Sequence, residues 1–232
     1  MNHSFKHIFF DLDRTLWDFE KNSHKELVSI FKRNELHQKG ISLKEEFIKV
    51  YKKINEECWE LYRNNKISKE KLRSERFNKT LHYFGINDDE LSKKIGDQYI
   101  KNSPKRTILI DGTKELLDHL SGKYKMHIIT NGFEEVQFDK LKNSGLLNYF
   151  DHVITSEAAG QKKPHPFIFQ YSLDLCNARV NESIMIGDDL QTDIKGAVDF
   201  GMPCIYFNPH NVQHPYKLSG DVTNLRAIKL IL

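Results

Sequence analysis

The sequence predicts an α/β fold: a doubly wound parallel sheet that carries an inserted block of helices. From about residue 108 onward, short apolar runs alternate with helix-length amphipathic stretches. Such alternation is typical of a parallel sheet with helices on both faces. One more apolar run, residues 7–10, is separated from that series by a long stretch without convincing strands. This first run can therefore supply a central strand of the same sheet.

The first predicted strand, residues 7–10, ends in two carboxylates and a hydroxyl. Asp11 and Asp13 are two positions apart, so their side chains point the same way if the extended geometry continues through them. Two carboxylates at close range repel each other unless a positive charge lies between them. Mg²⁺, which prefers hard oxygen ligands, is a suitable cation for this position.

The stretch that follows, residues 17–103, reads as entirely helical and is rich in Lys and Glu. Ser42, with Glu45 three residues later, has the pattern of a capping box in front of one helix. Ser68 is expected to begin another helix, and Asp88 or Asp89 a further one. The stretch is therefore predicted to be a helical domain inserted directly after the first strand.

The second half of the chain carries the remaining predicted strands, each a short apolar run next to a helical pattern. These strands are residues 126–130, 152–154, 184–187 and 203–207. Together with the first strand they are predicted to form a core domain. The predicted domains are thus a core of residues 1–16 and 104–232 and an insert of residues 17–103.

Ligands of doubly wound sheets bind beyond the carboxyl ends of the strands, so the residues that follow each strand are the candidate site. Three strand ends and one loop before a helix carry polar chemistry. The residues are Asp11, Asp13 and Thr15, then Thr130 and Asn131, then Lys163, and finally Asp188, Asp189 and Asp193. They supply carboxylates for a cation, donors for anionic oxygens and an ammonium group. Phosphoryl transfer needs this combination of groups.

Four of these sequence motifs resemble those of the haloacid dehalogenase superfamily of phosphohydrolases. The motifs are Asp11-Leu12-Asp13-Arg14-Thr15, Thr130, Lys163, and Gly187-Asp188 with Asp193. They occur in the family's order, each at the expected strand or helix end, and the resemblance covers essentially the whole chain. It implies the family's Rossmann-like core, and the helical insert resembles the family's small α-helical cap, which closes over the active site.

The resemblance also implies a chemical role for the residues around the first strand. Asp11 would attack phosphorus and form an aspartyl-phosphate, and Asp13 would protonate the leaving alcohol and then deprotonate the attacking water. Magnesium would be held by Asp11, by the backbone carbonyl of Asp13 and by Asp188. Thr15 would orient this loop rather than react.

Further roles follow for the other motifs. By the same resemblance, Thr130 and Asn131 would hold phosphate oxygens, and Lys163 would neutralise the charge of the nucleophile and of the phosphoryl group. Asp189 stands where many members of the superfamily have serine. Either Asp189 or Asp193 could therefore support the metal site, and the sequence leaves this choice open.

The segment between the first motif and the insert points to a substrate class. Residues 15–19, followed by Asn22, resemble the branch of nucleoside 5′-monophosphatases that act on pyrimidine and noncanonical pyrimidine nucleotides. Trp17, Phe19 and Asn22 are therefore candidates for contact with the leaving group, because an aromatic ring here could stack on a base. The alternative is that these aromatic side chains only pack the hinge.

The function predicted from these features is Mg²⁺-dependent hydrolysis of a small phosphate ester, a nucleoside 5′-monophosphate in the first instance. A phosphatase for phosphoglycolate or a sugar phosphate, or a sugar phosphomutase, would use the same residues. A signalling or binding protein phosphorylated on aspartate is the non-enzymatic alternative. Carbon–halogen hydrolysis needs neither a proton donor for an alcohol nor a metal, so Asp13 and Asp188 argue against it.

The overall composition bears on the kinds of partner and on the cellular location to expect. The net charge is +3 over 232 residues, with basic and acidic residues interspersed, which gives no electrostatic footprint for a nucleic-acid polymer. No apolar run approaches the roughly 18 residues of a membrane span. Residues 1–6 lead straight into the first strand and leave no room for a signal peptide, so a cytoplasmic location is expected.

The three cysteines, Cys58, Cys176 and Cys204, are expected to be free core thiols.

Overall fold

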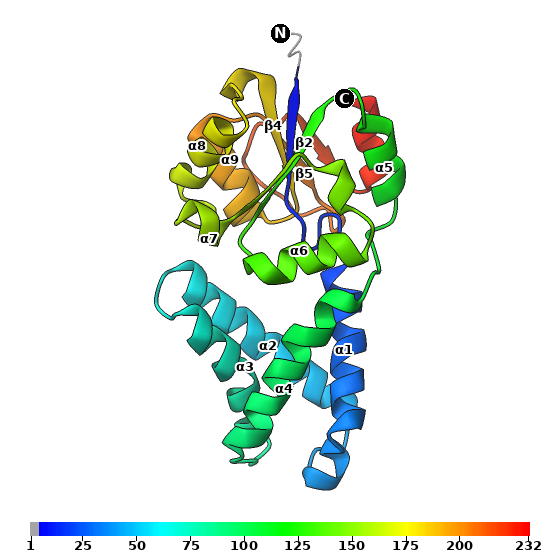
Figure 1. Cartoon of the computed structure of the whole chain (residues 1–232), viewed down its shortest axis with the longest axis vertical. Coiled ribbons are helices and arrows are strands. Elements are labelled where there is room, and N and C mark those ends of the chain that lie inside the picture. The colour runs from blue at the N-terminus through cyan, green and yellow to red at the C-terminus, as the bar shows by residue number, and fades with distance from the viewer. Residues whose placement is uncertain (1–4) are drawn as a thin grey trace. The chain divides into compact units, whose positions relative to one another are not determined.

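The computed structural model describes residues 5–232, which form two compact units. One unit comprises the chain up to Phe19 together with Thr107–Leu232, and the other is Glu20–Arg106. Figure 1 shows that the first unit is built around a sheet and that the second is made of helices. Within the described part of the chain, no helix has both the length and the apolar character that a bilayer-spanning helix needs.

The sheet has six parallel strands in the order β3-β2-β1-β4-β5-β6. Their bounds are His7–Phe10, Lys125–Thr130, His152–Thr155, Ser183–Gly187, Cys204–Phe207 and Gly220–Val222 for β1 to β6. The chain winds outward in one direction from β1 and in the other from β4, so the point where the strand order reverses lies between these two strands. This arrangement confirms the predicted doubly wound fold and the central place of the first strand.

Helices cover both faces of the sheet (Figure 1). The helices of this unit are α5 (Thr113–Leu120), α6 (Glu134–Asn143), α7 (Ser156–Ala159), α8 (Pro166–Leu175) and α9 (Lys195–Phe200). Ile8 and Phe10 of β1 pack in the core under α5, whereas Phe9 packs in the opposite core under α8 and α9. Burial on both faces explains why the strands read as continuous apolar runs.

The last strand, β6, was not predicted from the sequence. It has only three residues, Gly220–Val222, and two of them are Gly and Asp, which are depleted in strands. Parallel pairing with β5 places it at the edge of the sheet. Tertiary pairing therefore overrides a weak local preference here.

The second unit is formed by α1 from Glu20 onward and by three further helices. Their bounds are Phe19–Arg33 for α1, Lys44–Arg63 for α2, Lys69–Tyr83 for α3 and Asp89–Asn102 for α4. Ser68 caps α3, as predicted, and of the two predicted residues Asp88 and Asp89 it is Asp88 that caps α4. Their side chains accept backbone N–H bonds of 3.2 and 2.8 Å. The predicted capping box at Ser42 is wrong. The N-cap of α2 is Leu43, whose side chain has no oxygen, so Ser42 lies one residue outside the helix.

A buried ion pair joins the two ends of this helical unit. Glu26 in α1 is fully buried, and Arg106 donates to its Oε2 from Nη2 at 2.8 Å and from Nε at 3.1 Å. Arg33 lies 3.7 Å from the other carboxylate oxygen. A fully buried carboxylate is stable only when cations and hydrogen bonds satisfy it, so Arg106 is a structural anchor of the unit.

Candidate active site

The candidate site begins where β1 ends. The backbone N–H of Asp11 donates to the carbonyl of Ile186 at 2.9 Å, so sheet pairing extends one residue beyond the strand. The chain then turns tightly, because the N–H groups of Leu16 and Trp17 both donate to the carbonyl of Leu12. This turn directs the Thr15 hydroxyl back towards the carboxylates that follow β1 and β4.

Three buried or half-buried carboxylates meet at this edge of the sheet. Asp11, Asp188 and Asp193 each place one oxygen within 4.8 Å of the others. Thr15 joins two of them, since its hydroxyl lies 3.3 Å from Asp11 Oδ2 and 3.0 Å from Asp188 Oδ1. Burial raises the pKa of Asp11 to about 7, and it also raises the pKa of Asp188 and of Asp193. Three carboxylates this close repel one another when they are ionised, and a divalent cation would offset that repulsion. An all-oxygen donor set fits Mg²⁺.

Lys163 lies between two of these carboxylates. Its Nζ is 2.7 Å from Asp11 Oδ1, 2.7 Å from Asp193 Oδ1 and 2.7 Å from the carbonyl of Ile129, and the side chain is 1% exposed. Burial disfavours the ammonium, but the two carboxylates outweigh burial and raise the pKa of Lys163. The lysine is therefore a fixed positive charge beside Asp11.

Asp189 and Asp193, the two candidates for supporting the metal ligands, have different surroundings. Asp189 caps the π-helical turn Leu190–Ile194, because its Oδ1 accepts from the N–H groups of Gln191 and Thr192 at 2.9 Å each. Asp193 instead points into the cluster, where its oxygens accept from Lys163 and from the N–H of Asp189 at 3.1 Å. Of the two side chains, the structure thus brings only Asp193 to the carboxylate cluster.

Thr130 is the last residue of β2, and Asn131 follows it next to Lys163. The Asn131 amide exchanges two hydrogen bonds with the backbone of Lys163, at 2.8 and 2.9 Å. The Thr130 hydroxyl accepts from the N–H of Gly132 at 3.1 Å and from Gln137 Nε2 at 2.7 Å, which leaves its own proton free to donate. Asn131 therefore holds the lysine loop in place, and Thr130 keeps a donor.

Asp13 is held by two residues of α6 that sequence reasoning missed. Lys140 Nζ is 2.6 and 2.8 Å from the two carboxylate oxygens of Asp13, and Gln137 Nε2 is 3.0 Å from Oδ2. Both residues are buried, on the same helix face as Leu141. The sequence did contain a signal for these two residues: Gln137 and Lys140 are three positions apart on a helix face that also carries Leu141. A lysine on a buried face needs a partner for its charge. Burial lowers the pKa of Lys140, although Asp13 opposes that shift.

The three leaving-group candidates lie in different surroundings. Trp17 is 0% exposed and packs in the core under α5, with Lys140 Nζ 4.4 Å from the centre of its ring. Asn22 is also buried, within the helical unit. Phe19 is half-buried, with the Arg14 guanidinium 4.6 Å from its ring. Contact of these side chains with a substrate stays a prediction, and the burial of Trp17 and Asn22 does not support it.

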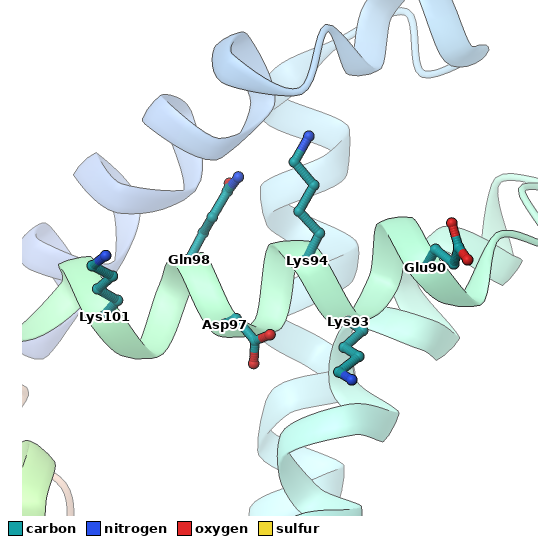
Figure 2. Close-up of a pocket in the computed structure, with 6 residues that line it drawn as sticks. All are labelled: Glu90, Lys93, Lys94, Asp97, Gln98 and Lys101. Carbon is teal, nitrogen blue, oxygen red and sulfur yellow. The ribbon is translucent and has the colours of Figure 1, made fainter.

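A shallow hollow of about 420 Å³ on α4 differs from this site (Figure 2). Its lining residues are Glu90, Lys93, Lys94, Asp97, Gln98 and Lys101. Figure 2 shows the side chains of Lys94 and Gln98 on one side of the helix and those of Lys93 and Asp97 on the other. Because these groups come from a single helix, carry mixed charges and do not converge, the hollow is best described as a solvated helix face.

A family profile and two curated relatives match most of this chain. The profile of a family described as haloacid dehalogenase-like hydrolase matches residues 8–207. The pyrimidine 5′-nucleotidase PynA of Streptococcus pneumoniae is 28% identical over 212 residues, which cover 90% of this chain and 86% of PynA. The pyrimidine 5′-nucleotidase YjjG of Escherichia coli is 29% identical over 228 residues, 97% of this chain and 96% of YjjG.

A solved structure resembles the whole chain. The magnesium-bound crystal structure of the HAD-hydrolase YfnB from Bacillus subtilis superposes with a TM-score of 0.88 at 26% identity. The alignment covers 98% of each chain. The likeness therefore extends over both compact units, as well as over the strand ends that carry the candidate site.

Proposed function

The chain belongs to the haloacid dehalogenase-like hydrolase family and is a phosphatase of that family, and we propose that it hydrolyses pyrimidine nucleoside 5′-monophosphates with the help of Mg²⁺. One observation carries the chemical part of this proposal. Asp11 lies between a fixed ammonium, Lys163, and a second carboxylate, Asp188. A buried carboxylate held in this way is suited to attack a phosphorus atom that brings its own negative charge.

The proposed reaction has two steps. In the first, a carboxylate oxygen of Asp11 bonds to phosphorus while the ester P–O bond breaks, and Asp13 gives a proton to the departing alcohol. In the second, Asp13 takes a proton from a water molecule whose oxygen bonds to phosphorus, and the bond between phosphorus and the Asp11 carboxylate breaks. Inorganic phosphate leaves, and both carboxyl groups return to their starting states. Lys140 and Gln137 hold Asp13 in one orientation for both transfers.

The residues around the phosphoryl group divide into direct contacts and supports. Lys163 and the Thr130 hydroxyl are proposed to bind phosphoryl oxygens, and Asn131 acts through the backbone of Lys163. Asp11, Asp188 and the backbone carbonyl of Asp13 would hold Mg²⁺, which supplies positive charge to the phosphoryl oxygens when it is bound.

Asp193 supports this arrangement through its ion pair with Lys163, at 2.7 Å. Thr15 does so through its hydrogen bonds to Asp11 and Asp188. The core of residues 1–16 and 104–232 thus contains every residue of the proposed reaction, and residues 17–103 are kept as the proposed cap domain.

The substrate class rests on two relatives that are pyrimidine 5′-nucleotidases and that align with this chain over nearly its full length. A phosphate-release assay with Mg²⁺ tests it by comparing uridine, deoxyuridine and thymidine 5′-monophosphates with purine nucleotides, phosphoglycolate and hexose phosphates. We expect the pyrimidine nucleotides to give the highest kcat/KM and EDTA to abolish the activity.

Asp11→Asn is the control for a contaminating phosphatase, because it removes the nucleophile and leaves the preparation otherwise the same. Preference for phosphoglycolate or a hexose phosphate would overturn the substrate assignment alone. Transfer of the phosphoryl group to a sugar instead of water would indicate a phosphomutase. Full turnover in Asp11→Asn would contradict the mechanism itself.

A further inference from the structure

Three histidines lie side by side on neighbouring strands of the sheet. His7 begins β1, His127 lies in β2 and His152 begins β3. His127 and His152 are paired in register, and their rings stack with centroids 5.5 Å apart. His7 stacks on the other side of His127 at 5.4 Å. All three point to the sheet face covered by α8 and α9, since they alternate with residues of the other core.

Cys176, the C-cap residue of α8, approaches this histidine row from the helix layer. One nitrogen of His127, one nitrogen of His152 and the sulfur of Cys176 all lie within 4.8 Å of one another. Ligands of a single zinc ion are separated by roughly 3–4 Å, given bonds of about 2.0 Å to nitrogen and 2.3 Å to sulfur. We propose that His127, His152 and Cys176 bind one Zn²⁺-type transition-metal ion.

An unsatisfied atom in the core supports this site independently. His127 is 1% exposed, and its Nδ1 has no hydrogen-bond partner among residues 5–232. Its other nitrogen, Nε2, is 3.1 Å from Nδ1 of His7 and shares a hydrogen bond with it. Such a bond fixes the orientation of a metal-binding imidazole and leaves the opposite nitrogen to the metal. When Nε2 of His127 carries the ring proton and donates to His7, Nδ1 presents a buried lone pair that no residue among 5–232 uses.

The protonation state of His127 suits metal binding, whereas Cys176 must first lose a proton. Burial lowers the pKa of His127 to about 3, so its imidazole is neutral and able to coordinate. Burial raises the pKa of the Cys176 thiol to about 12. Binding must therefore release the thiol proton to solvent as the metal–sulfur bond forms, and affinity should increase with pH.

The geometry requires a small local rearrangement. The rings of His127 and His152 are inclined by 26°, so their nitrogen lone pairs run side by side rather than towards one point. Rotation of the half-buried His152 ring about its Cβ–Cγ bond would aim its nitrogen at the ion. A water molecule would supply the fourth ligand.

This site differs in chemistry from the carboxylate cluster at the other end of β1. Two imidazoles and a thiolate favour Zn²⁺ or Co²⁺, whereas carboxylate oxygens favour Mg²⁺. An ion bound here would join β2 and β3 to the end of α8. The proposal therefore concerns a structural metal site and does not depend on the phosphatase reaction.

Co²⁺ titration of the metal-stripped full chain tests the proposal, because cobalt bound to a thiolate has a near-ultraviolet charge-transfer band that cobalt bound to carboxylates lacks. We expect this band to saturate at one equivalent, to resist Mg²⁺ and to be displaced by Zn²⁺. Cys176→Ser should abolish the band. The matched control is Cys204→Ser, which removes another buried thiol of the same core that is not part of the cluster.

A second variant keeps the test decisive if Cys176→Ser does not fold. His152→Ala changes a half-buried ring and should lower Co²⁺ affinity at least tenfold while circular dichroism stays unchanged. The proposal is overturned if wild type lacks the charge-transfer band, or if either the Cys176 or the His152 variant keeps it at wild-type affinity. Phosphatase activity with Mg²⁺ is measured in parallel, so failure of this site is distinguishable from failure of the proposed function.

Discussion

The ammonium group of Lys140 lies 2.6 Å from Oδ1 and 2.8 Å from Oδ2 of Asp13. Lys140 is buried and also covers the ring of Trp17, so it has little freedom to leave this position. The carboxylate of Asp13 is therefore held in one direction by a charge-assisted contact, and Gln137 reinforces it from the same helix. In the proposed reaction, this contact makes Lys140 a positioning residue for proton transfer.

Lys140→Met should lower kcat about 10- to 100-fold and change KM by less than about threefold, because a misdirected proton donor slows the reaction more than binding. Steady-state kinetics with Mg²⁺ on the best substrate measure the effect. Lys142→Met is the matched control, since Lys142 is exposed on the same helix and should keep wild-type kcat. Wild-type kcat in Lys140→Met would show that the ion pair serves packing alone.

Stabilisation by Mg²⁺ should increase with pH. Burial raises the pKa of Asp11 to about 7, and in an unfolded chain it is about 4. The native carboxyl therefore binds a proton more tightly than the unfolded one, so its contribution to metal-free stability is lost as pH rises from about 4 to about 7. Mg²⁺ binds the deprotonated carboxylates and restores that stability. Melting temperatures in EDTA and in Mg²⁺ should differ more at about pH 8 than at about pH 5.

Groups elsewhere in the chain titrate equally in both buffers, so their effect cancels in the difference between the melting temperatures in Mg²⁺ and in EDTA. Asp11→Asn serves as the control, because it removes a proposed ligand and should lose most of the Mg²⁺-dependent shift. An equal shift at both pH values would contradict the link between these carboxylates and the metal.

Gly187→Ala should disrupt the site although glycine at 187 needs no special backbone angle. A Cβ atom at this position would lie 2.2 Å from Oδ2 of Asp193, which is buried and paired with Lys163. We expect a loss of about 1–3 kcal/mol in the free energy of unfolding, together with loss of activity. Denaturant unfolding and the phosphate-release assay measure the two effects.

Gly96→Ala in α4 is the control, because its new Cβ would meet atoms at 3.6 and 3.8 Å, an ordinary contact distance. It should stabilise the helix by up to about 1 kcal/mol. If Gly187→Ala is as stable as wild type, Asp193 can move without cost and is not a fixed support of the site.

Arg106→Met should destabilise the helical unit by about 2–4 kcal/mol, because it removes the nearer of the two arginines that pair with the fully buried carboxylate of Glu26. Arg63→Met removes an exposed pair with Glu56 and should cost about 1 kcal/mol or less. Denaturant unfolding of both variants gives the comparison. Equal losses would mean that Glu26 is neutralised in some other way when Arg106 is absent.

Local patterns were enough for the fold class, for the central first strand and for the positions of the motif residues. Strand β1 is apolar at nearly every position because both of its faces are buried, and this leaves a direct signal in the sequence. The change from apolar to acidic at Asp11 marks the end of the strand in the same way. The assignment of Asp11 and Asp188 to one edge followed from these local signals and from the rule that parallel strands end together.

Only the tertiary structure decided which residues hold these groups. Lys140 is separated from Asp13 by 127 positions, and Asn131 from the loop of Lys163 by 32. The structure also placed Asp193 rather than Asp189 in the carboxylate cluster and brought His127 and His152 close to Cys176. Such contacts depend on strand order and helix placement, and the energy of a buried polar group depends on its partner. The spacing of residues along the chain encodes neither these long-range contacts nor the energy of a buried polar group.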